Sequence, residues 1–114
     1  MSLEVRAVAK YIRMSAQKVR LVTDLVRGMD ALEALDVLRF TPRAAAVEVR
    51  KVVQSAIANA EENYGLSADE LYISEITADE GPTLKRGRPG ARGRYKPILK
   101  RSAHITVVLS ERQP

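Results

Sequence analysis

Basic side chains are concentrated in one segment of the sequence, residues 81–101, which contains eight Lys or Arg residues and no Asp or Glu. These eight residues are Lys85, Arg86, Arg88, Arg92, Arg94, Lys96, Lys100 and Arg101. Cationic groups at this density repel one another unless a polyanion neutralises them. Nucleic-acid phosphates can do so, and the release of their counterions supplies much of the binding free energy. The segment therefore predicts a nucleic-acid interface.

Two structures are compatible with this basic segment. Its glycine and proline residues, and a length unusual for a loop, are typical of a solvated or disordered linker. Alternatively, Pro89 and Gly90 favour a type II turn near its middle, between two extended arms. Arms of about ten residues, at roughly 3.3 Å per residue, would extend about 30 Å from the rest of the chain. Tyr95 is the one aromatic residue of the segment, so we expect contacts mostly to the nucleic-acid backbone.

The remaining candidates for chemistry do not form an enzyme site. Three glycines have neither the dinucleotide-binding nor the P-loop spacing, and no helix is predicted after them: Gly87, Gly90 and Gly93. Asp79 and Glu80 are adjacent at the end of a predicted strand, where neighbouring side chains point to opposite faces. His104 is the single histidine, and there is no cysteine to act as a nucleophile or a metal ligand. We therefore predict a protein that is not an enzyme and has neither a cofactor nor a metal site.

The composition is that of one globular domain. The chain has 114 residues, of which 46% are apolar, and a net charge of +5. This average hides a strongly positive segment at residues 81–101 beside residues 29–80, which contain four basic and eleven acidic residues. No apolar run approaches the roughly 18 residues that a membrane span needs, and the first residues do not resemble a secretory signal. We expect one domain over residues 1–114, with residues 81–101 as an extended basic hairpin arm.

The first part of the chain predicts a strand followed by a helix. Residues 3–13 show the period-two pattern of a strand with one buried face, which would carry Leu3, Val5, Ala7, Ala9 and Tyr11. Ser15 is a suitable N-cap for the helix, and Gly28 is placed to end it. Arg20 and Asp24 are spaced to form an ion pair. The apolar residues of this helix recur at helical spacing: Val19, Leu21, Val22, Leu25 and Val26.

Two further helices are predicted before residue 65. Asp30 and Glu33 form a capping-box pattern at the start of the second, which should end near Phe40. Thr41 as N-cap and Pro42 at the first helical position predict a third helix, extending to about residue 63. Its apolar face is rich in alanine, which lets other elements approach closely and predicts a central helix; the face comprises Ala45, Val49, Val52, Val53, Ala56 and Ala60.

The complete pattern predicts an α+β fold. Residues 71–78 and 102–110 are rich in β-forming side chains and predict two more strands. The order β-α-α-α-β-β indicates a three-stranded antiparallel sheet packed on three helices, with a long β-hairpin protruding between the last two strands. A helix-turn-helix around Gly28 is a weaker alternative, because its recognition helix would present Glu33 and Asp36 to DNA phosphates.

Several segments together resemble one known family, in the same order along the chain. These segments are residues 14–28, 55–61, 79–86, 89, 91–94 and 100–109. The family that they resemble is that of the universal large-subunit ribosomal protein numbered twenty-two in bacteria, and its first helix and long helix are among the matches. The chain departs from the family's usual pattern at residues 16–17, where Pro-Arg is common, and at Gly87 and Gly90.

The resemblance implies a structural constituent of the large ribosomal subunit that binds ribosomal RNA and supports subunit assembly. It implies RNA contacts from Lys18 and Arg20 in the first helix and from the basic residues of the arm. The hairpin tip would line the nascent-peptide exit tunnel and face the nascent polypeptide with Arg88, Pro89, Gly90, Ala91 and Arg92. The implied protein is a monomer within the cytoplasmic ribosome that contacts neighbouring ribosomal proteins and no membrane. A free-standing nucleic-acid-binding regulator with a basic arm is the alternative.

Overall fold

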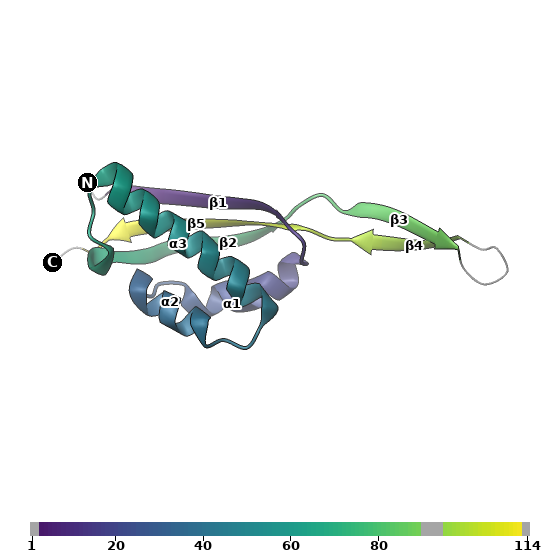
Figure 1. Ribbon diagram of the computed structural model, residues 1–114, viewed down its shortest axis with the longest axis horizontal. Helices are drawn as coiled ribbons and strands as arrows, with labels where there is room; N and C mark the ends of the chain where they lie inside the picture. Colours follow the sequence, from purple (N-terminus) through teal and green to yellow (C-terminus); the bar gives the residue numbers. More distant parts are fainter. Residues whose placement is uncertain (1–2, 90–94, 113–114) are drawn as a thin grey trace.

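The computed structural model describes residues 3–89 and 95–112 and has the predicted α+β fold (Figure 1). Three helices cover one face of a three-stranded sheet, and a separate two-stranded sheet extends from one end of this body (Figure 1). In chain order the elements are β1 (Glu4–Ile12), α1 (Ala16–Val26), α2 (Ala31–Arg39), α3 (Ala44–Tyr64), the short 3₁₀ helix η1 (Ala68–Glu70), β2 (Leu71–Glu80), β3 (Leu84–Pro89), β4 (Tyr95–Lys100) and β5 (Ala103–Glu111).

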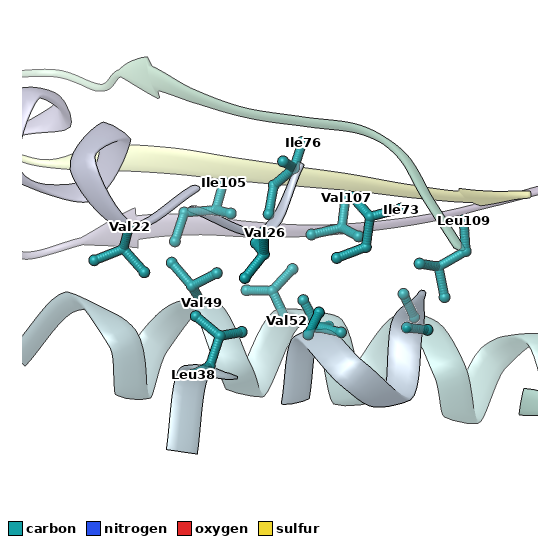
Figure 2. Packing of buried hydrophobic residues seen from close by; sticks show 14 of the residues in the cluster. Val22, Val26, Leu38, Val49, Val52, Ile73, Ile76, Ile105, Val107 and Leu109 are labelled. Carbon is teal, nitrogen blue, oxygen red and sulfur yellow. The ribbon is translucent and has the colours of Figure 1, made fainter. Parts of the chain in front are cut away.

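Strand β5 is the centre of the larger sheet. The order is β1-β5-β2, and both neighbours run antiparallel to β5. Alternate side chains of β5 point toward the helices, and Ile105, Val107 and Leu109 are fully buried there (Figure 2). The predicted three-stranded antiparallel sheet packed on three helices is therefore confirmed.

Helix α3 is central to the core, as its alanine-rich face predicts. It contacts α1, α2, β1 and β5. Ala56 and Ala60 have no exposed surface, and their small side chains let the neighbouring elements approach the helix backbone. Val49 and Val52 lie between this helix and the rest of the core (Figure 2). The close packing that results makes the body a rigid base for the arm.

Three predictions about helix ends have different outcomes. Ser15 is confirmed as the N-cap of α1, since its side-chain oxygen accepts a bond of 3.4 Å from the Lys18 backbone N–H. Asp30 precedes α2 but makes no side-chain cap bond, because its carboxylate accepts a bond of 2.7 Å from Arg112 Nε instead. The start of α3 was predicted two residues early: the Thr41 hydroxyl donates to the Val37 carbonyl of the preceding helix, and α3 begins at Ala44.

The exposed side of α1 also differs from the prediction. Leu21 and Leu25 are 52% and 46% exposed, so the buried stripe of this helix consists of valines and small residues. The predicted pair of Arg20 with Asp24 does not form. Asp24 instead pairs with Arg27 at 2.7 Å, because the Arg20 side chain is held by β2.

The described part of the basic segment is a hairpin rather than an irregular loop. Strands β3 and β4 pair only with each other, in a register that runs from Leu84 opposite Lys100 to Pro89 opposite Tyr95. The type II turn predicted at Pro89 and Gly90 is wrong for Pro89, because this residue is paired with Tyr95 as the last residue of β3. Gly90 lies outside the described residues. The paired strands carry the basic residues away from the body along its long axis (Figure 1).

Candidate nucleic-acid interface

The arm places most of its described basic residues on two paired strands. Five of the predicted contact residues belong to β3 and β4: Lys85, Arg86, Arg88, Lys96 and Lys100. The register sets Arg88 opposite Lys96, and like charges at paired positions destabilise an isolated hairpin. Arg101 follows β4 and is exposed, whereas Arg92 and Arg94 lie outside the described residues. This charge pattern favours a polyanion around the arm.

A groove of about 1060 Å³ opens where the arm meets the body, and we call it the root groove. The end of β1 and the start of α1 form one wall, and the base of the arm, where β3 begins and β4 ends, forms the other. Four exposed cations line it: Arg13, Lys18, Lys100 and Arg101. Among the described residues, no Asp or Glu lines this groove and none of the four cations forms an ion pair. The positive surface of the arm thus continues onto the body.

The root groove unites some of the predicted residues and adds one that sequence reasoning missed. Lys18, predicted as a contact of the first helix, lies in the same groove as Lys100 and Arg101 of the arm. Arg13 was not predicted, because it is distant from the arm in sequence and no motif marks it. Its basic character between the predicted strand and the N-cap Ser15 was the one available signal.

Arg20 contacts strand β2, whereas Lys18 lines the root groove. Its Nε donates a hydrogen bond of 2.9 Å to the Ala78 carbonyl of β2, and it is not among the residues that line the root groove. Arg27, two turns further along α1, donates from Nη2 to the Ile76 carbonyl at 2.9 Å. These two arginines hold α1 against the edge of β2, so Arg20 orients the helix that presents Lys18.

Tyr11 is not on the buried face of β1, contrary to the prediction. The register of β1 against β5 shifts between Ala9 and Ile12, and Tyr11 has a left-handed backbone with φ of 60°. This bulge turns its side chain outward, so Tyr11 is 64% exposed and lines the root groove. The Tyr11 N–H donates to His104 Nδ1 at 3.0 Å, and the two rings meet edge to face at 5.0 Å. His104 therefore positions Tyr11, a role that its sequence pattern did not predict.

Gly81 joins the two segments that enter and leave the arm where they meet the body. Its N–H donates to the Ser102 carbonyl at 3.0 Å, and the Ser102 hydroxyl donates to the Pro82 carbonyl at 2.8 Å. A Cβ at Gly81 would lie 2.5 Å from Ser102 Oγ and 3.0 Å from His104 Cε1. The two segments that connect the arm to the body are thus held together at Gly81 and Ser102, and a side chain at position 81 does not fit there.

We predict that Gly81→Ala lowers the free energy of unfolding by about 1–3 kcal/mol, because the new methyl group must displace Ser102 and press against His104. Urea unfolding followed by circular dichroism measures this change. Thr83→Ala, an exposed position two residues further on, is the control and should change stability by less than about 0.5 kcal/mol. Equal stability of Gly81→Ala and the wild type would contradict the tight packing of this base.

Over residues 3–89 and 95–112, no group of three or more His, Asp or Glu residues is placed to hold a metal ion. No helix of these residues is both long enough and apolar enough to cross a membrane.

A small α+β body, a cationic hairpin and a basic groove at its root are together typical of a nucleic-acid-binding protein. Comparison with protein families makes the class specific: the family described as ribosomal protein L22p/L17e matches residues 7–110. The chain belongs to this family and is a protein of the large ribosomal subunit. The resemblance inferred from the sequence motifs is thereby confirmed.

Curated relatives match over nearly the full length of the chain. The large ribosomal subunit protein uL22 of Clostridium novyi is 54% identical over 110 residues, which cover 96% of this chain and 99% of that protein. The protein of the same name from Clostridium kluyveri is 56% identical over 111 residues, covering 97% and 100%. That from Lacticaseibacillus casei is 55% identical over 107 residues, covering 94% and 92%.

Proposed function

We propose that this chain binds the RNA of the large ribosomal subunit through its arm and root groove, and supports assembly of the subunit as a non-catalytic structural component. We further propose that the hairpin tip lines the nascent-peptide exit tunnel, where residues 88–92 face the nascent polypeptide. Neighbouring ribosomal proteins contact the body, and the protein is present as a monomer within the ribosome. The membership of the chain in its family and the family's expected hairpin support these finer statements.

The observation that carries RNA binding is the separation of charge between arm and body. Residues 81–101 have eight basic and no acidic residues, while the rest of the chain has eleven basic and fourteen acidic residues. Within residues 3–89 and 95–112, the basic strands β3 and β4 pair with each other and with no strand of the body. A polyanion can therefore surround the arm and reach the basic root groove, while the acidic residues of the body stay outside the RNA.

The proposed RNA contacts have different roles on the arm, in the root groove and at Arg20. Residues of the arm neutralise phosphates along its length: Lys85, Arg86, Arg88, Arg92, Arg94 and Lys96. Lys100, Arg101 and Lys18 meet RNA at the root groove, where the structure groups them. Arg20 uses Nε to hold α1 on β2, and its remaining guanidinium nitrogens contact RNA beside Lys18.

Sedimentation of cell extract on a sucrose gradient tests this function directly. We expect the protein only in fractions that contain large subunits or intact ribosomes. A protein found mainly free, together with tight and sequence-specific binding of the purified chain to duplex DNA, would support a free-standing regulator instead.

We predict that binding of the purified protein to large-subunit ribosomal RNA weakens steeply with salt. Eight phosphate contacts, one for each basic residue of the arm, give a slope of log affinity against log salt of about −6 to −7. Fluorescence anisotropy with labelled RNA between low and physiological salt measures this slope. A slope near −1 would show that the arm is not the contact surface.

A further inference from the structure

Tyr11 combines three features that a purely structural residue does not need. It is the one described non-glycine residue with a positive φ, a conformation that costs free energy for a bulky side chain. Bulges of this kind re-aim side chains near functional sites. Here the bulge moves an aromatic ring from the predicted buried face into the root groove, where 64% of the residue is exposed.

The contacts of Tyr11 hold its ring in place and leave it accessible. The His104 ring meets it at an interplanar angle of 88°, which is an edge-to-face contact rather than a parallel stack. The hydrogen bond from the Tyr11 N–H to His104 Nδ1 fixes the backbone of the bulge. The ring is therefore oriented before any ligand arrives, which lowers the entropy cost of binding.

The surroundings of Tyr11 select the chemistry of the ligand. Met14, Leu84 and Leu99 provide apolar walls in the same groove. Arg13, Lys18, Lys100 and Arg101 surround them with positive charge. Glu80 lines a small neighbouring cavity beside the start of α1, and it does not line the root groove. A flat, apolar ring flanked by phosphates fits this combination, and a simple inorganic anion would leave the aromatic and apolar walls unused.

We propose that the root groove is a binding site for an unpaired nucleotide of RNA, whose base stacks on Tyr11 while its flanking phosphates contact the surrounding cations. Unpaired bases stack readily on exposed aromatic side chains, whereas the bases of a continuous duplex are not accessible for this contact. The groove volume of about 1060 Å³ is ample for one nucleotide and its flanking phosphates. The inference rests on the proposed RNA binding and adds a site that the charge pattern alone did not predict.

A single-stranded RNA hexamer with a central 2-aminopurine tests the site, since the fluorescence of this base falls when it stacks. We expect the full-length wild-type chain to bind the hexamer and to quench its fluorescence. Tyr11→Leu should weaken binding about 5- to 150-fold, the range measured for loss of one base-stacking contact, and should abolish the quenching. Tyr11→Phe keeps the ring and should retain both properties.

Tyr64→Leu provides the matched control, because Tyr64 is 49% exposed near the end of α3 and does not line the root groove. It should bind the hexamer as the wild type does. Thermal unfolding of every variant checks that the fold is intact. Binding and quenching by Tyr11→Leu equal to the wild type would overturn the stacking site while leaving the proposed RNA binding of the arm in place. Failure of the wild type to bind large-subunit RNA would overturn both proposals.

Discussion

A chain that lacks residues 85–99 should remain folded and lose most of its affinity for large-subunit RNA. Leu84 and Lys100 are opposite each other in the hairpin register, so an Asn-Gly turn inserted between them closes the shortened hairpin without changing its base. Among the strands that the structure describes, the deleted β3 and β4 pair only with each other. The buried core lies in the helices and the three-stranded sheet, so cooperative thermal unfolding should persist.

The loss of affinity follows from the charges removed with the arm. The deletion eliminates six of the eight basic residues of the segment, so the salt slope should become shallower by about 4 to 5 units if each residue neutralises one phosphate. Fluorescence anisotropy across a salt series measures both affinity and slope. A full-length variant with Lys85, Arg86, Arg88 and Lys96 replaced by Gln separates the effect of charge from that of shape. Unchanged RNA affinity, or a non-cooperative unfolding transition, would refute the separation of arm and body.

Several features that depend only on neighbouring residues in the sequence were predicted correctly. The alternation of Ile105, Val107 and Leu109 specifies which face of β5 is buried, because strand side chains alternate whatever their partners are. Ser15 caps α1 through a backbone group three residues away. Gly28 has the expected left-handed φ of 84° after α1. Each of these features is determined by local geometry that the sequence displays directly.

Two of the errors arise where a residue distant in sequence competes for the same group. Asp30 has a local capping role available, yet its carboxylate binds Arg112 near the other end of the chain. Arg20 has Asp24 one turn away, but Nε donates to the Ala78 carbonyl of β2. A backbone carbonyl at a sheet edge is invisible to pattern reasoning, because its availability depends on which strands pair.

The candidate site also combines features that neighbouring residues determine with features that depend on residues distant in sequence. The cations of the arm are contiguous in sequence, so their charge alone indicates a nucleic-acid interface. The root groove is assembled from β1, α1 and the ends of the arm, and the contact of Tyr11 with His104 spans 93 positions. Since the alternation of β1 extends through Tyr11 without a visible interruption, the sequence did not reveal the bulge that exposes it.

The core of the body should be sensitive to the truncation of a single buried side chain. Ile105 lies on the central strand β5, is fully buried, and packs toward the helices (Figure 2). We predict that Ile105→Ala lowers the free energy of unfolding by about 2–5 kcal/mol, because it removes buried methyl groups and leaves a cavity that close packing prevents from collapsing. Urea unfolding at equilibrium measures the change.

Val8→Ala is the control for this substitution, because Val8 lies on β1 and is 48% exposed; it should change stability by less than about 0.5 kcal/mol. Since small domains have a total stability of about 5–15 kcal/mol, Ile105→Ala can unfold a substantial fraction of the free protein. Ile105 also adjoins His104, which positions Tyr11 at the root groove, so the RNA affinity of the remaining folded molecules should fall as well. RNA affinity per folded molecule equal to that of the wild type would show that the core and the groove are mechanically independent.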